Sequence, residues 1–234
     1  MSFLALLQKE LRHYFNSPIA YVLLIAFLLM SGGMFASYFF LSKQANMNLL
    51  FSLFPMFFIF FAPALSMRLF AEEKRQGTFE SLVTLPVSDM TIAGAKYIAS
   101  IILVLVILLL TWICPLMIST MGPLEWGVTI TGYIGIFIMV ATLLSIGMFI
   151  SSLTRNQIVA FIISVVIAVV LLFAGNFSLL FPEPFGGIVD YIGFQSHLNA
   201  FLRGVIDLRD ILYFGSLITV MLLLTKESMA QRHA

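Results

Sequence analysis

Charged residues gather in one short stretch, residues 71–96, AEEKRQGTFESLVTLPVSDMTIAGAK. Its adjacent carboxylates, Glu72 and Glu73, are of the residue type that binds metals or acts as a general acid or base. A membrane enzyme built on paired glutamates would need metal ligands or a base inside the bilayer. The histidine that comes nearest to a predicted span is His13, at its edge. We therefore expect no catalytic residue and no metal site, and a different role for this stretch.

The composition of the whole chain indicates a membrane protein. Of its 234 residues 10% are charged and 61% are hydrophobic, whereas a soluble domain has about 25% charged residues. The mean hydropathy is +1.08. A net charge of +1 gives no basic excess for binding nucleic acid, and the single Cys114 excludes an internal disulfide and a cysteine-based metal site.

Uncharged stretches predict an all-α, polytopic membrane protein with a single domain over residues 1–234. A helix needs about 20 apolar residues to cross the hydrocarbon core. The predicted spans are 18–41, 49–68, 92–118, 128–152, 156–175 and 209–226. The last span is short of uncharged residues, so it must recruit residues beyond them or lie in a thinned bilayer. Pro55, Pro63 and Pro115 fall inside spans and should kink them.

Basic residues in the loops predict the orientation. With both termini in the cytoplasm, nine basic residues lie inside and three outside, Lys43, Arg203 and Arg209. The inside set is Lys9, Arg12, Arg68, Lys74, Arg75, Lys96, Arg155, Lys226 and Arg232. Nine against three places the charged stretch in the cytoplasm, between the second and third spans.

The N-terminal residues 3–15, FLALLQKELRHYF, place apolar side chains on one side at helical spacing. Gln8, Lys9 and Arg12 lie on the other side. This pattern predicts an amphipathic helix in the cytoplasmic interface of the membrane. The alternative is a basic extension of the first span.

Helix signals divide the charged stretch between residues 72 and 90. Gly77 can end the helix that continues the second span, and Ser88 can cap the next helix. Between them, Phe79, Leu82 and Val83 share one face of a short helix that Thr78 caps and Pro86 ends. The segment is thus predicted to be an amphipathic helix held between two spans, with a solvated loop as the alternative.

These residues carry a resemblance to a known family. The run from 72 to 88, E-E-K-R-x-G-T-F-E-S-L-x-T-L-P-V-S, resembles the signature loop of ABC-2 type transporter permeases. A second stretch, 196–217, SHLNAFLRGVIDLRDILYFGSL, resembles the segment before their last helix. The chain is most similar to the short six-helix permeases of the gliding-motility-associated and nitrous-oxide-reductase-maturation type.

The resemblance implies the membrane subunit of an ATP-driven exporter in the bacterial cytoplasmic (inner) membrane. The helix after the second span would be a coupling helix, so we call residues 72–90 the coupling segment. The N-terminal helix would be an elbow helix. The implied coupling residues are Phe79, Glu80, Leu82, Val83 and Thr84, and the implied stalk residues are Glu72, Glu73, Lys74 and Arg75. Two permeases pair in this family, either identical copies or related chains.

Nucleotide binding is expected on another polypeptide. The sequence has no G-x-x-x-x-G-K-[ST] phosphate loop, so we expect no cofactor on this chain and ATP on a cytoplasmic ABC ATPase subunit. The chain itself is expected not to be an enzyme, with membrane lipid as its other neighbour.

The segment 178–208 before the last span is too polar to cross the membrane, although it retains apolar positions. We predict one or two short external helices that re-enter the outer leaflet, where irregular backbone must be shielded by protein. In the family such elements close the external mouth, which implies a gate at His197, Phe201 and Arg203. His197 is expected to pack between helices, because no second His or Cys is near it in sequence.

The rival class is an ATP-independent channel or carrier. Such proteins usually place ionisable groups in the middle of the membrane. The six uncharged stretches contain none, which favours the ATP-driven permease.

Overall fold

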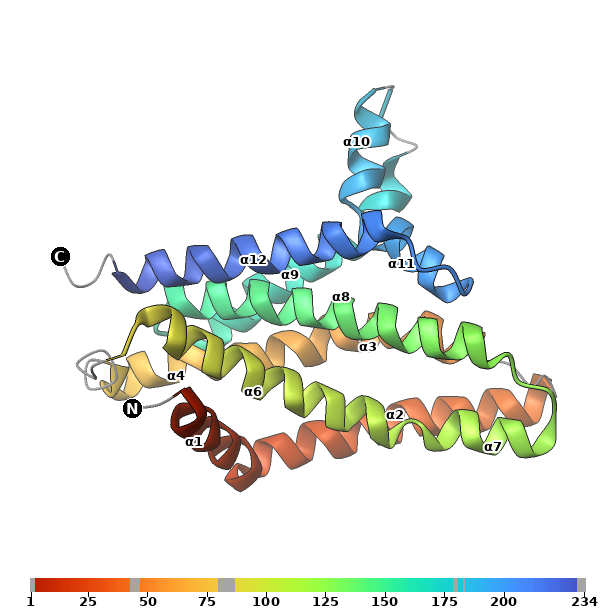
Figure 1. Cartoon of the computed structure of the whole chain (residues 1–234), viewed down its shortest axis with the longest axis horizontal. Coiled ribbons are helices and arrows are strands. Elements are labelled where there is room, and N and C mark those ends of the chain that lie inside the picture. The colour runs from red at the N-terminus through yellow and green to blue at the C-terminus, as the bar shows by residue number, and fades with distance from the viewer. Residues whose placement is uncertain (1–2, 43–46, 80–86, 179–180, 183, 231–234) are drawn as a thin grey trace.

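The computed structural model describes residues 3–42, 47–79, 87–178, 181–182 and 184–230. Within these ranges the regular structure is helical and contains no strand, as predicted (Figure 1). The helices are α1 (Phe3–Asn16), α2 (Pro18–Ser42), α3 (Asn48–Ser66), α4 (Arg68–Gln76), α6 (Asp89–Leu110), α7 (Ile113–Met121), α8 (Trp126–Leu153), α9 (Gln157–Phe177), α10 (Phe185–Ile192), α11 (Phe194–Leu202) and α12 (Leu208–Ala230).

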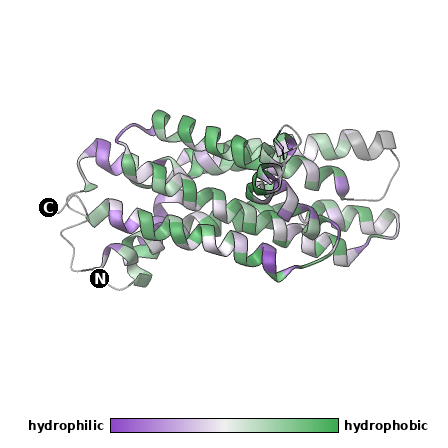
Figure 2. Ribbon diagram, turned by 90° about the horizontal axis from the view of Figure 1, so that it is seen from above, coloured by the Kyte–Doolittle hydropathy of each residue, from purple (hydrophilic) through white to green (hydrophobic). Residues whose placement is uncertain are grey.

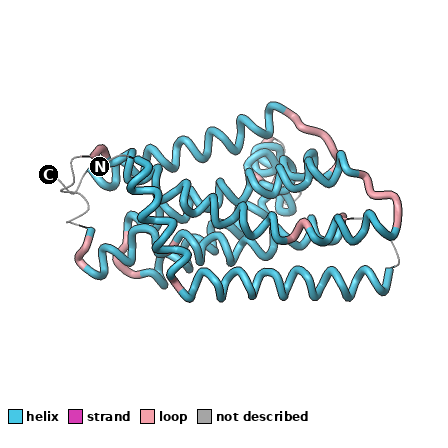
Figure 3. The backbone as a smooth tube through the Cα atoms, turned by 60° about the horizontal axis from the view of Figure 1, so that its bottom comes forward, coloured by secondary structure: helices cyan, strands magenta, loops and turns pink. Residues whose placement is uncertain are grey.

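Six stretches are long and apolar enough to cross a membrane, which confirms the predicted number of spans. They are α2, α3 with α4, α6 with α7, α8, α9 and α12. These helices run along one long axis, and both termini lie at the same end of the bundle (Figures 1 and 3). We call this end the terminal end. Apolar colour follows the helices, while strongly hydrophilic residues gather toward their ends (Figure 2).

The spans differ sharply in how much of them the chain itself covers. In α8, 78% of the apolar stretch is buried, and in α3 with α4, 67%. The corresponding shares are 22% for α2, 28% for α9 and 17% for α12. Helices α3 and α8 therefore form the centre of the bundle, and the other three present most of their apolar surface outward.

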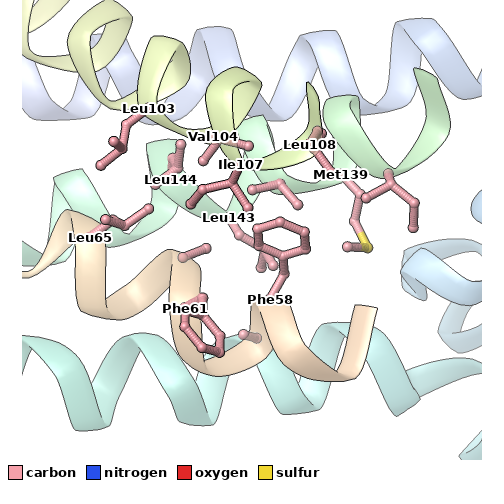
Figure 4. Packing of buried hydrophobic residues seen from close by; sticks show 14 of the residues in the cluster. Phe58, Phe61, Leu65, Leu103, Val104, Ile107, Leu108, Met139, Leu143 and Leu144 are labelled. Atoms are coloured by element: carbon pink, nitrogen blue, oxygen red, sulfur yellow. The ribbon is translucent and has the colours of Figure 1, made fainter. Parts of the chain in front are cut away.

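The core lies where α3, α6 and α8 meet. Phe58 and Leu65 from α3 point toward Ile107 from α6 and Leu144 from α8 (Figure 4). Close approach between α3 and α8 requires Gly147, because a Cβ atom there would lie 1.9 Å from the Ser66 Oγ. Any larger residue at this position would push the two central helices apart.

The second span is broken at Met67, where α3 ends and α4 begins. Ser151 of α8 bonds the backbone at this break. Its Oγ donates to the Met67 carbonyl (2.8 Å) and accepts from the amides of Phe70 (3.1 Å) and Ala71 (3.0 Å). A polar backbone group left unpaired in an apolar environment is costly. The Ser151 hydroxyl therefore makes the break compatible with burial.

The third span is also broken, at Thr111 and Trp112 between α6 and α7. Pro115 lacks an N–H and cannot bond the Thr111 carbonyl four residues earlier. That carbonyl instead accepts from the Cys114 amide (3.0 Å) and from the Tyr133 hydroxyl of α8 (3.2 Å). The kink predicted from Pro115 is thus present as an interruption of the helix.

The last span is longer than its uncharged residues, as α12 takes in Asp210 near its start and Lys226 near its end. Asp210 is 8% exposed and pairs with His197 of α11, whose Nδ1 lies 2.7 Å from Asp210 Oδ1. Because its charge has a partner, the helix can begin before the apolar stretch. Helices α10 and α11 fill the segment before it, with α10 projecting across the long axis (Figure 1).

Replacing Ser151 with alanine should destabilise the bundle by about 1–3 kcal/mol, because the Met67 carbonyl and the Phe70 and Ala71 amides lose a buried partner. Unfolding of the purified protein in detergent, followed by circular dichroism, measures this effect. Ser145→Ala is the matched control on the same helix, since the Ser145 Oγ is also buried but donates only to Thr142 of its own helix. Equal losses in the two variants would contradict this role of Ser151.

Candidate coupling site

The coupling segment is held by helix ends of the predicted type. Helix α4 ends at Gly77, which adopts the left-handed conformation (φ 72°) that favours glycine. The Thr78 amide then bonds the Glu73 carbonyl (3.0 Å). On the other side, Ser88 caps α6 by accepting from the Thr91 amide (3.3 Å). Both signals, Gly77 and Ser88, are confirmed.

Lys96 of α6 is the centre of a buried ion cluster. Its side chain is 3% exposed, and its Nζ lies 2.7 Å from Glu73 Oε1 of α4 and 3.1 Å from Glu10 Oε1 of α1. An unpaired charge at such a place would cost several kcal/mol of desolvation. Three helices from distant parts of the sequence are therefore held together by one ammonium group.

Lys74, next along α4, is bound to α8 instead. Its Nζ donates to the Ser152 carbonyl and lies 4.9 Å from the centre of the Phe79 ring. Phe79 is 7% exposed and packs edge-on against Phe70, with ring centres 6.2 Å apart. Phe79 therefore packs back onto Phe70 of α4 and lies beside Lys74, which is bound to α8.

A third set of contacts joins the second span to the N-terminal helix and to Ser17, the residue between α1 and α2. Arg68 Nε lies 3.0 Å from Glu72 Oε2, and Arg68 Nη1 is 3.4 Å from Ser17 Oγ. The Tyr14 hydroxyl of α1 donates to the Leu65 carbonyl (3.3 Å). Burial, and secondarily the Glu10 carboxylate, raise the pKa of Tyr14. The phenol therefore keeps its proton and its role as a donor.

The predicted site residues have different surroundings. Glu72 contacts Arg68 and Gln76 of its own helix, whereas Glu73 contacts α6 and Lys74 contacts α8. Arg75 is exposed. Phe79 is buried within the chain. The remaining predicted coupling residues, Glu80, Leu82, Val83 and Thr84, lie outside the described residues.

Sequence reasoning did not identify Glu10 or Ser151 as important residues. It also did not identify Lys96 as the partner of Glu10. Glu10 lies among the polar residues of an amphipathic helix and looks like an ordinary surface residue. The available signal was charge: Lys96 lies about two turns into α6, a largely apolar helix where a buried cation needs a carboxylate.

At the opposite end of the bundle, His197 fixes α10 and α12 to α11. Besides the Asp210 contact, its Nε2 lies 2.8 Å from the Tyr191 carbonyl. The ring is thus held between an oxygen atom of α12 and one of α10. Tyr213 stacks on the ring at 3.9 Å and donates to the Ile192 carbonyl (2.6 Å).

The other two residues of the predicted external gate lie apart from this cluster. Phe201 is fully buried beside Gly135 of α8. Arg203 ends α11 and is exposed. The three residues therefore occupy three environments: an ion-paired joint, the core and the surface.

The fold and the site together define a multi-pass membrane protein whose strongly hydrophilic residues are concentrated toward the helix ends. Residues 13–175 match the model of a family described as ABC-2 family transporter protein. The matched region covers well over half of the chain, from the end of α1 into α9. The chain therefore belongs to the ABC-2 transporter family and is a membrane permease subunit of an ABC transporter. A search among curated proteins found no match.

Lys96→Met should destabilise the protein by about 3–5 kcal/mol, because Glu10 and Glu73 would remain buried without their cation. The free energy of unfolding in detergent measures this loss. Lys226→Met is the control, because the Lys226 side chain is 45% exposed and makes only a long, solvent-accessible ion pair with Glu227 (3.8 Å). This substitution should change stability by less than about 0.5 kcal/mol. Adding Glu73→Gln to Lys96→Met should recover part of the loss. Similar stability of the two lysine variants would contradict the central role of Lys96.

Proposed function

We propose that this permease is part of an exporter in the bacterial cytoplasmic membrane, with both termini in the cytoplasm. Family membership implies an ATPase partner, and the absence of a phosphate loop from the sequence supports ATP binding by that partner. The second membrane half of the transporter is another copy or a related permease. The resemblance to gliding-motility-associated and nitrous-oxide-reductase-maturation permeases is part of this proposal.

The observation that carries the proposal is the attachment of α4. The coupling segment begins within α4 and ends within α6. Lys96 ties both of these helices to α1. A force applied to the segment by an ATPase therefore acts on the second and third spans and on the N-terminal helix together. Displacement of packed helices as rigid bodies is a common route for such transitions.

The role of each end of the bundle follows from this assignment. Residues 78–84 would contact the ATPase, with Leu82 and Val83 supplying apolar anchors, and α1 would be the elbow helix in the interface. At the other end, α10 and α11 would close the external mouth. The His197 joint supports this role, because it binds both short helices to α12.

An ATP-independent channel or carrier remains the rival. The buried ion cluster does not favour it, since Glu10, Glu73 and Lys96 pair with one another near the terminal end. Such a cluster joins helices and leaves no row of ionisable groups along a pathway.

Leu82→Asp should abolish assembly with the ATPase, because a buried unpaired charge at an interface costs several kcal/mol. The tagged chain is purified from its own host in a mild detergent. The wild type should carry ATP hydrolysis and a polypeptide with a phosphate-loop motif. The variant should lose both while still inserting in the membrane.

The control for this experiment is Val205→Asp, because Val205 is 57% exposed in the loop between α11 and α12, at the other end of the bundle. It should keep the ATPase. Phe79 is unsuitable as a target, because its burial within the chain would mix folding with assembly. ATP turnover retained in Leu82→Asp would refute the coupling role of residues 78–84.

Cysteine labelling tests the orientation. The native Cys114 is 6% exposed and gives a low background. A membrane-impermeant maleimide should label Arg155→Cys only in inside-out vesicles and Arg203→Cys only in intact spheroplasts, because these exposed positions are predicted on opposite sides. The reverse pattern would overturn the topology.

A further inference from the structure

A cavity of about 670 Å³ opens at the terminal end between α1, α2, α3, α4 and α6. Its volume lies within the range of about 300–1,000 Å³ typical of small-molecule sites. The coupling role proposed above does not use this cavity. Its walls are of two kinds, charged on the side of α1 and α4 and apolar on the side of α2 and α3.

The charges around the cavity are nearly balanced. Four cationic side chains line it, Lys9, Arg12, Arg68 and Lys96, together with three anionic ones, Glu10, Glu72 and Glu73. Lys96 is already neutralised by Glu10 and Glu73. The exposed Lys9 and Arg12 of α1 remain at the mouth and can bind an anionic group.

One acceptor beside the cavity is left without a donor. Glu73 Oε2 is buried and has no hydrogen-bond partner, although Oε1 of the same carboxylate binds Lys96. Glu72, in contrast, is paired within its own helix, because Arg68 Nε lies 3.0 Å from its Oε2 and Gln76 bonds its Oε1. Buried polar atoms are normally paired. The Glu73 oxygen therefore points to a ligand that brings N–H donors.

The apolar wall shows where such a ligand comes from. Ile19, Leu23, Ala64 and Leu65 line the cavity on the side of α2 and α3. Only 22% of the apolar stretch of α2 is buried within the chain, so this wall continues onto a helix face that lies against lipid or a neighbour. A ligand with both a zwitterionic head and acyl chains fits the charged and the apolar walls at once.

We propose that this cavity binds the headgroup of an aminophospholipid such as phosphatidylethanolamine. The primary ammonium donates to Glu73, the phosphate lies against Lys9 and Arg12, and the acyl chains follow α2. A purely anionic lipid would leave the Glu73 oxygen unpaired. Phosphatidylcholine would supply the charges but no N–H donor.

A methylation series tests the proposal on the unmodified protein. The delipidated chain is incubated with phosphatidylethanolamine, its monomethyl and dimethyl derivatives, or phosphatidylcholine, all with the same acyl chains. Native mass spectrometry measures retention. We expect retention to fall with each N–H removed, by roughly tenfold over the series, because each loss removes a charge-assisted hydrogen bond. Equal retention of the first and last lipids would overturn the proposal.

Two variants locate the site. Glu73→Gln should abolish the preference for phosphatidylethanolamine over phosphatidylcholine, and Arg12→Gln should weaken both lipids alike by removing a phosphate contact. Arg203→Gln, exposed at the other end, should change neither. If Glu73→Gln does not fold, the methylation series and the exposed Arg12→Gln decide.

Water-soluble glycerophosphoethanolamine distinguishes a lipid from a free headgroup. It should not displace the bound lipid at equal concentration, because it lacks acyl chains for the α2 wall. Displacement by it, or a preference for phosphatidylethanolamine that survives Glu73→Gln, would overturn the assignment.

Discussion

The buried ammonium of Lys96 constrains the whole terminal end of the bundle. It lies near the start of an apolar span and is almost fully buried, so carboxylates must compensate its charge. Glu10 arrives from α1 and Glu73 from α4, and neither is near Lys96 in sequence. Because removal of Lys96 would leave two buried carboxylates without a cation, its ammonium group holds the three helices together as one unit. The placement of the coupling segment and of the cavity follows from this unit.

A second constraint is that each interruption of a span has its backbone satisfied by another helix. Ser151 serves the break at Met67, and Tyr133 serves the break at Thr111. Both come from α8, which is the most buried span. Broken helices survive in an apolar environment only when protein supplies the missing partners. The central position of α8 and the two breaks are therefore mutually dependent.

Much of this fold is predictable from local sequence, and the reason is physical. Hydropathy determines which stretches cross a membrane, and Gly77 and Ser88 mark helix ends through their own backbone chemistry. The site is less predictable, because its contacts join residues as far apart as Glu10 and Lys96. The four predicted stalk residues, Glu72 to Arg75, illustrate this difference. Successive side chains on a helix point about 100° apart, so the four face different surroundings. The run of charges alone does not show which surroundings these are.

The uneven burial of the spans bears on how motion can pass through the chain. Helices α3 and α8 are locked by Gly147 and Ser151, so a displacement of α4 cannot stop at the break but must move α8 as well. Helices α2, α9 and α12 have few buried residues and can slide against their surroundings at smaller cost. Close-packed interiors transmit strain, whereas loosely covered surfaces absorb it. Under the proposed function, the path from the coupling segment to the far end of the bundle would therefore run through α8, which also packs against α11, the helix of the His197 joint.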